Sequence, residues 1–351
     1  MSTTTNHKNC QTKREDHTSF VNGICVIGAA VLLLISYGCN EAGEEQVAEE
    51  TEVERAVEAE ESEQVVEITA THDPEADEHL FELSDEEIPS GWTAFRLVNN
   101  SPDEHLAQIF RIPEDAGVTA DVWIDDFIVE VQRMMERFQT PEVNTLAEAR
   151  EGVEYPDWAA EISPRGGPGI ISAGGTAEAM AQLEPGHYII ECYIKDENEM
   201  MHTALGMAAL LIVTDEQSGA AEPETDIELT ISDEGIQSSG NVEAGEQNIR
   251  VNFEERETPG YRNINLVRLD DGYRLEELSK WMHTWFPGGL VAPVPFEFAG
   301  GTGRKPAGQA TYFSIDFEPG DYAWVSEYPI GAESQVNLED KGLLKTFTVE
   351  P

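Results

Sequence analysis

The sequence predicts an all-β protein that contains two tandem Greek-key β-sandwich domains, each with one short inserted helix. Short segments of alternating apolar and polar residues, separated by turn residues, recur through residues 86–351, as they do in β-sandwiches. One longer segment with helical periodicity interrupts them in each half. Similar turns recur at one constant spacing, which places the domains at 86–215 and 226–351 with a polar linker between them.

The first 38 residues have the pattern of an export signal. Three basic residues precede the apolar segment Ile24–Ile35, which is too short for a comfortable membrane-spanning helix. The Gly38-Cys39 pair resembles the end of a bacterial lipobox, so Cys39 is the predicted lipidated first residue of the mature chain. The alternative is an uncleaved N-terminal anchor. Both interpretations place the protein in the cell envelope, attached to a membrane on the periplasmic side or at the cell surface.

Residues 39–85 are rich in Glu, Ala and Val and predict an acidic, disordered linker between the lipid and the first domain. The whole chain carries 69 acidic and 21 basic residues, a formal net charge of -48. A charge of this sign argues against nucleic acid as a partner, since binding phosphates requires clustered Lys and Arg. Solubility and a high-salt habitat are two open explanations of the charge.

The first domain is expected to consist of short strands around one helix. The helix is predicted over residues 118–138, where apolar side chains recur on one face. The predicted strands, in chain order, are Trp92–Asn99, His105–Ile112, Tyr188–Ile194 and Gly206–Thr214.

The second domain repeats the turns of the first. Gly300–Gly303 matches Gly166–Gly169, and Phe317–Gly320 matches Leu183–Gly186, both at the same offset in the chain. A helix-like stretch at Leu275–Trp285 takes the place of the first domain's helix. These matches predict an internal duplication.

The cysteines single out one residue of the globular part. Cys10 and Cys25 lie in the predicted signal and Cys39 is the predicted lipidation site, which leaves Cys192 as the remaining thiol. A single cysteine in an exported protein is either a small buried side chain or a metal ligand.

Three further side chains complete a possible metal site with Cys192. His105 begins an early predicted strand, while His202 and Met207 precede the last apolar strand of the first domain. Two imidazoles, one thiolate and a weak axial thioether are the ligands of a blue-copper centre, in which a trigonal His2Cys plane serves both oxidation states. The sequence therefore predicts one copper ion bound by His105, Cys192, His202 and Met207.

Residues 85–215 resemble the cupredoxins, the plastocyanin-like family. The resemblance is carried by Ile88–Trp92, Val98–His105, the Leu-Glu-Pro-Gly-His-Tyr segment before Cys192, and the His-x4-Met spacing of His202 and Met207. It implies a cupredoxin-like sandwich that binds copper for electron transfer or copper handling, with a redox or copper-donor protein as its partner. In one respect the chain departs from the family, because the nine residues between Cys192 and His202 make a longer loop than electron-transfer members have. Such a loop, folded back as a hairpin, is expected to hold His202 less rigidly.

The second domain provides an internal comparison. The positions aligned with the four candidate ligands are occupied by Arg262, Ser326, Leu338 and Leu343. The turns persist while all four ligands are lost together, which favours a metal site in the first domain and a metal-free second copy.

A structural explanation of the same residues stays open. Cys192 and Met207 are also typical core side chains, and His105 can simply end a strand. The second hypothesis is therefore a metal-free binding or scaffolding module of the cell envelope that retains only the fold.

Met200 and Met201 are expected to pack over the end of the sandwich, although thioethers also bind Cu(I). The remaining histidines are expected to be exposed at the end of the linker (His72 and His79), exposed in a turn (His187) or partly buried on the second helix (His283). No enzyme motif is present, so we expect no enzymatic activity.

Overall fold

The computed structural model describes residues 63–351 except 74, 77, 141, 144, 256–259, 270–273, 285 and 328–336. The predicted signal segment, Cys39 and the linker up to residue 62 lie outside the described residues. Among the residues described, no helix is both long and apolar enough to cross a membrane.

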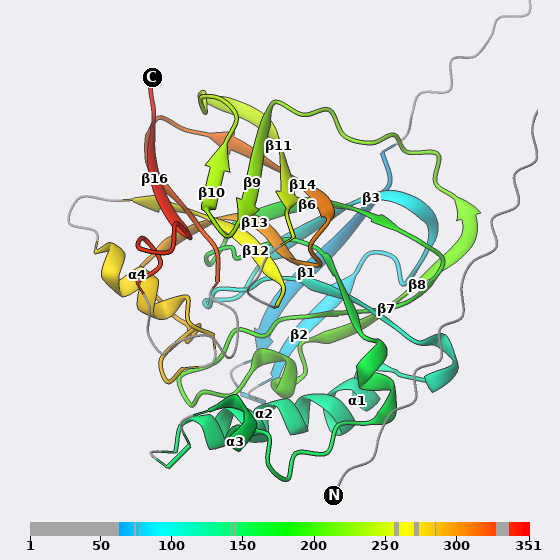
Figure 1. Cartoon of the computed structure of the whole chain (residues 1–351). Helices are drawn as coiled ribbons and strands as arrows, with labels where there is room; N and C mark the ends of the chain where they lie inside the picture. The colour runs from blue at the N-terminus through cyan, green and yellow to red at the C-terminus, as the bar shows by residue number, and fades with distance from the viewer. Residues whose placement is uncertain are drawn as a thin grey trace, which may run out of the picture. The chain divides into compact units, whose positions relative to one another are not determined.

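The first half of the described chain forms a two-layered β-sandwich (Figure 1). One layer has the strand order β2-β1-β3-β6 and the other β5-β4-β7-β8. The long strand β3 belongs to both layers, because its start pairs with β8 and its end pairs with β6 and β1. The strands are β1 (Val65–Asp73), β2 (Glu78–Leu83), β3 (Glu87–Asn99), β4 (Gln108–Ile112), β5 (Ser163–Gly166), β6 (Thr176–Leu183), β7 (Gly186–Glu191) and β8 (Ala208–Gln217).

The second half has the same strand order. Its layers are β10-β9-β11-β14 and β13-β12-β15-β16, and β9 runs parallel to β11 as β1 runs parallel to β3. The strands are β9 (Ile227–Ser232), β10 (Gly235–Ser238), β11 (Gly245–Phe253), β12 (Arg262–Leu269), β13 (Glu297–Lys305), β14 (Gln309–Phe317), β15 (Gly320–Val325) and β16 (Leu344–Val349). The predicted all-β sandwich class is confirmed.

Each half also carries the inserted helix that the sequence predicts. In the first half, α1 (Ala120–Val122), a π-helical segment (Trp123–Ile128) and α2 (Val129–Phe138) follow one another directly, and the short α3 (Leu146–Ala149) comes next. The hydroxyl of Thr119 accepts a hydrogen bond from the amide of Val122 and caps the start of this stretch. In the second half, α4 spans Leu275–Trp281. Figure 1 shows α1, α2 and α3 together, with α4 apart from them.

The predicted disordered linker is wrong over its last part, because residues 65–73 form β1 and residues 78–83 form β2. Val66, Ile68 and Ala70 are buried at alternate positions of β1, while the charged Glu67 between them is exposed. This period-two alternation is a strand signal, but the acidic composition of the whole segment obscured it.

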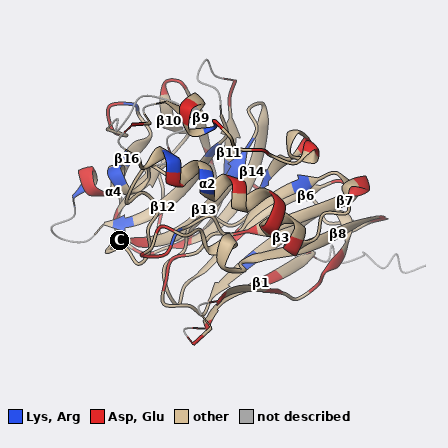
Figure 2. Ribbon diagram, turned by 90° about the horizontal axis from the view of Figure 1, so that it is seen from below, with Lys and Arg blue, Asp and Glu red and all other residues tan. Residues whose placement is uncertain are grey.

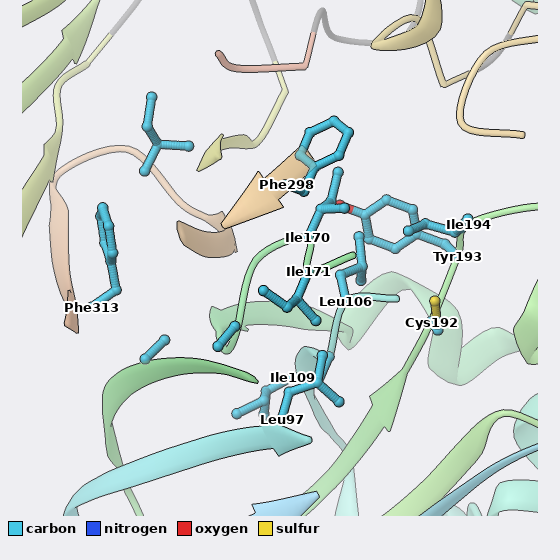
Figure 3. Close-up of a cluster of buried hydrophobic side chains, with 14 of the residues drawn as sticks. Leu97, Leu106, Ile109, Ile170, Ile171, Cys192, Tyr193, Ile194, Phe298 and Phe313 are labelled. Carbon is cyan, nitrogen blue, oxygen red and sulfur yellow. The ribbon is translucent and has the colours of Figure 1, made fainter. Parts of the chain in front are cut away.

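The two halves share one sheet and one core. The edge strand β6 pairs with β14, through Phe313 opposite Ala179 and its neighbours on either side. The buried apolar side chains of both halves form one continuous cluster, in which Phe298 of β13 lies beside Ile170 and Ile171 of the first half (Figure 3). The described residues, from 63 onward, accordingly group as one compact unit.

The recurring glycines have a structural reason at this interface. The amide of Gly169 donates to the carbonyl of Gly301 at 3.0 Å, and the amide of Gly303 donates to the carbonyl of Gly167 at 2.7 Å. A Cβ atom on Gly169 would lie 2.7 Å from the carbonyl carbon of Gly301, closer than any side chain tolerates. The two glycine segments therefore allow the backbones of the two halves to touch.

The excess of negative charge is dispersed. Asp and Glu residues lie on elements of both halves, including α4, β3 and β8 (Figure 2). The dispersed charge is what solubility requires and does not by itself mark a site.

Candidate metal centre

Three of the four predicted ligands meet with their coordinating atoms facing one another. The Nδ1 atoms of His105 and His202 lie 3.1 Å apart, and the sulfur of Cys192 lies 3.6 Å and 3.7 Å from them. A triangle with these sides has its centre about 2.0 Å from each atom, which is close to the ~2.0–2.3 Å that nitrogen and sulfur ligands keep from an ion such as zinc. The three atoms thus form a trigonal plane of the size that a metal ion fills.

His105 is fixed by the turn before it and by a distant segment. The Asn99 side chain donates to the carbonyl of Asp103 at 2.8 Å and so holds the turn between β3 and the histidine. His105 then exchanges two backbone hydrogen bonds with Ile171, at 3.1 Å and 2.8 Å. The histidine backbone is therefore held from two sides.

The other three ligands are connected by backbone hydrogen bonds. Cys192 follows β7, and its amide donates to the carbonyl of Met207 at 3.3 Å. The amide of Met207 donates to the carbonyl of His202 at 2.9 Å, and the amide of Thr203 donates to the carbonyl of Cys192 at 2.8 Å. Met207 is fully buried, and its backbone bonds to both Cys192 and His202, so its thioether remains a candidate ligand.

The loop between Cys192 and His202 folds back as a hairpin, as expected, but it is held firmly. Within it, Lys195 pairs with Met201 and the amide of Asp196 donates to the carbonyl of Met200 at 2.8 Å. Within the hairpin, the Glu199 carboxylate accepts a hydrogen bond from the buried Lys195 ammonium at 2.6 Å. It also accepts one from the amide of Gly288, outside the hairpin, at 2.7 Å. These contacts of the charged loop residues argue against the expected looseness of His202.

The second half contributes to this support directly. The amide of Lys195 donates to the carbonyl of Leu290, and the amide of Ala292 donates to the carbonyl of Lys195, both at 2.8 Å. A segment of the second half therefore pairs with the ligand-bearing hairpin of the first.

Burial sets the protonation of the three groups. It lowers the pKa of His105 to about 3 and the pKa of His202 well below its usual range, and the neighbouring histidines act in the same direction. It raises the pKa of the Cys192 thiol to about 12, against the opposing effect of hydrogen bonds from the amides of Leu106 and Ile194. Figure 3 shows Cys192 beside this apolar cluster. Neutral imidazoles are ready to bind a metal, whereas the thiol must lose its proton when the metal enters.

The donor set fits copper. The imidazole Nε2 atoms of His105 and His202 are buried and have no hydrogen-bond partner among the described residues, whereas both Nδ1 atoms face the Cys192 sulfur. Two convergent imidazole nitrogens, one thiolate and a nearby thioether suit copper in a trigonal site, where mixed hard and soft ligands serve both oxidation states.

Two further histidines, expected to be solvated, lie against this centre. His79 of β2 is 1% exposed, and its ring stacks on the His202 ring with centroids 4.1 Å apart. His72 of β1 stacks in turn on His79 at 4.2 Å and keeps 16% of its side chain exposed. The sequence did carry a signal for them: the alternation Val66-Glu-Ile-Thr-Ala70 recurs as Ile227-Glu-Leu-Thr-Ile231 at the start of the second half.

The aligned positions of the second half have the same backbone and different chemistry. The amide of Ser326 donates to the carbonyl of Leu343, and the amide of Leu343 donates to the carbonyl of Leu338, just as in the Cys192–Met207–His202 chain of contacts. All three side chains are buried, and none offers a strong metal ligand.

No known family model matches the chain, and no curated protein matches it either. Similar solved structures include a multicopper oxidase, with 12% identity over 82% of this chain and 88% of that chain and a TM-score of 0.22. A dithionite-reduced auracyanin from Roseiflexus castenholzii has 17% identity over 44% of this chain and 98% of that chain, with a TM-score of 0.24. A copper-containing nitrite reductase from Thermus scotoductus has 12% identity over 82% of this chain and 62% of that chain, with a TM-score of 0.22. The description of the metal centre rests on its own geometry.

Proposed function

We propose that the protein binds one copper ion through His105, Cys192, His202 and Met207 and uses it to exchange single electrons with a partner. The observation that carries the proposal is the triangle of two imidazole nitrogens and one sulfur, whose centre lies about 2.0 Å from each atom.

The protein residues have three roles in this proposal. His105, Cys192 and His202 would hold the copper ion with two imidazole nitrogens and one thiolate, and Met207 would add a weak thioether ligand. The hairpin and the backbone hydrogen bonds hold these ligands in one arrangement, which keeps the reorganisation on electron exchange small. Complete burial excludes water from the plane. Copper bound there would supply the one-electron redox couple.

Electron transfer is favoured over copper handling or enzymatic activity. Handing over a metal requires ligands that open, whereas the ligand loop is bound to α2 and to residues 288–292. An enzyme requires a coordination position that a substrate reaches, whereas the predicted ligands are buried. We propose a carrier, not an enzyme, with a redox protein as its partner.

The remaining parts of the proposal concern the location and the second half. We infer export and attachment to a membrane through a lipid on Cys39, on the sequence pattern alone. We also infer that the second half is a duplicated copy that lost its ligands and now supports the first, which its shared sheet and its hydrogen bonds to Lys195 favour.

A copper titration of the whole chain tests the function. A fragment that starts at residue 86 is unsuitable, because it lacks β1, β2 and the histidine that covers the site. We expect one equivalent of Cu(II) to produce an intense visible thiolate-to-copper absorption, which Cys192→Ser abolishes. A colourless wild-type protein whose copper binding is unchanged in Cys192→Ser would contradict the proposal and favour the metal-free envelope module.

A further inference from the structure

Three imidazoles form a stacked column from the metal centre to the surface. The planes of His202 and His79 differ by 10°, and those of His79 and His72 by 8°, with centroid separations of 4.1 Å and 4.2 Å. His202 is fully buried, His79 is 1% exposed, and the His72 side chain is 16% exposed. The column therefore begins at a ligand and ends where solvent is reached.

A ring nitrogen of His79 lies within 4.8 Å of ring nitrogens of His105 and His202, but the stacking disfavours His79 as a further ligand of the same ion. A metal held by a ring nitrogen lies in the plane of that ring, because the nitrogen lone pair does. The His79 ring is nearly parallel to the His202 ring and stacked on it, so the two planes are separate. The lone pairs of His79 cannot point at an ion bound in the plane of His202. His79 is therefore a neighbour of the candidate ligand His202, and its ring covers the His202 ring.

The column belongs to the half that carries the site. Register places Ile68 opposite Leu97 in β1 and β3, as Leu229 is opposite Val251 in β9 and β11. Beyond the matching positions, β9 ends at Ser232, whereas β1 continues to Asp73. The extra length of the hairpin carries His72 and His79, which face each other as register partners.

The ligand loop is shaped to receive this hairpin. Gly206, between His202 and Met207, has a φ of +111°, and a Cβ atom there would lie 3.1 Å from the carbonyl oxygen of His79. Glycine therefore permits both the turn and the close approach of β2. The contact is close, so His79 is held against His202.

We propose that the column His202–His79–His72 is the route by which electrons pass between the metal centre and the surface, and that its outer end is the contact point for a cationic one-electron carrier. The inference rests on the proposed copper function. The stacked rings connect His202, which is itself covered, to the partly exposed His72 through direct ring contacts. The single electron that leaves the reduced centre reduces the carrier, and no proton or group is transferred.

The surroundings of the outer end define the charge of the carrier. Asp103 lies 3.8 Å from His72, and Asp196 and Glu197 are close enough to act on the Asp103 carboxyl. An acidic rim attracts cationic partners and increases their association rate at low ionic strength.

The test measures oxidation of the copper(I)-loaded whole chain by hexaammineruthenium(III) in a stopped-flow instrument. His79→Leu and His72→Leu are expected to slow the reaction several-fold, His79→Phe to keep most of the rate because its ring still stacks, and His187→Leu, on another strand, to leave it unchanged. The visible band and the copper stoichiometry of all variants are expected to equal those of the wild type. In the metal-free protein, Cys192 in His79→Leu is expected to react with a thiol reagent as slowly as in the wild type, which shows that the site stays covered.

The outcomes separate this inference from the function beneath it. A normal thiolate–copper band with rates unchanged in both leucine variants would overturn the electron route and leave the copper function intact. A wild-type protein without that band would overturn both. If His79→Leu fails to fold, His72→Leu at the partly exposed end decides the question with the same readouts.

Discussion

The ring of His79 lies flat against the ring of His202, although the two residues come from opposite ends of the first half. The contact joins the hairpin of β1 and β2 to the loop that carries His202. A substitution in one of these elements is therefore expected to shift the other. A Cβ atom on Gly206 would lie 3.1 Å from the carbonyl oxygen of His79.

Gly206→Ala is expected to loosen the cover over the metal centre. Its φ of +111° disfavours any residue with a Cβ, and the added atom meets the His79 carbonyl at 3.1 Å. We expect a stability loss of about 1–3 kcal/mol and a faster reaction of Cys192 with thiol reagents in the metal-free protein. Gly117→Ala is the control, since its φ is also positive but nothing lies within 4 Å. Equal thiol reactivity in the two variants would contradict a tight cover.

Returning one ligand to the second half is expected not to create a metal site. Ser326 occupies the position of Cys192, but Arg262, Leu338 and Leu343 stand where the other ligands would be. The double variant Cys192→Ser/Ser326→Cys should therefore remain colourless on addition of Cu(II), while the single variant Ser326→Cys keeps the wild-type spectrum. A thiolate–copper band in the double variant would mean that the second half supplies ligands we have not identified.

The buried carboxylate of Glu327 is expected to be important for stability. It accepts hydrogen bonds from the Tyr193 hydroxyl at 2.7 Å and from Asn263, Thr284 and Arg304. Glu327→Gln leaves the largely buried Arg304 guanidinium without its countercharge, which costs about 3 kcal/mol or more. Glu318→Gln breaks an exposed ion pair with Arg268 and should cost less than about 1 kcal/mol. Urea unfolding compares the two, and similar losses would show that the buried cluster is not a stabilising unit.

Lys305 makes stability depend on alkaline pH. Burial lowers its pKa to about 8, with the nearby Arg165 acting in the same direction. Between pH 8 and the ordinary lysine value of about 10.4, the unfolded chain binds the proton and the folded chain does not, so this residue makes stability rise with pH there. Below pH 8 the buried Lys305 is protonated in the folded chain as well, so the full free-energy cost of burying its charge lowers stability.

Lys305→Met should remove that cost. The variant is expected to be more stable than the wild type by up to about 3 kcal/mol at pH 7, with the advantage shrinking as the pH approaches 10. Lys345→Met, at an exposed position of β16, should show no such difference. Denaturation curves at several pH values measure both, and an advantage of Lys305→Met that is constant with pH would rule out titration as its cause.

The sequence predicted the sandwich class and the side chains that meet at the candidate centre because both depend on local patterns. Cys192, His202 and Met207 are close in the chain, and strand alternation and turn residues mark the elements around them. His105 was recognised because it precedes an early strand. The tertiary structure brings the Nδ1 atoms of His105 and His202 and the sulfur of Cys192 close together, in agreement with the pattern.

The contacts that were missed depend on register and on partners far away in the chain. β1 pairs in parallel with β3 as far as Ala70 and then continues to Asp73. His79 lies opposite this extension, on β2, and so reaches His202. An acidic average over residues 39–85 hid the alternation in β1. The pairing of β6 with β14 was equally hidden, since the periodicity of a strand does not reveal which edge it joins.

The pairing of β6 with β14 has a thermodynamic consequence. Because one sheet and one apolar core run through both halves, the halves are expected to melt together in a single cooperative transition. A metal ion that binds only the folded first half then stabilises the second half by the same amount, through mass action. Loading the centre should therefore raise the unfolding temperature reported by Trp324, deep in the half that holds no ligands.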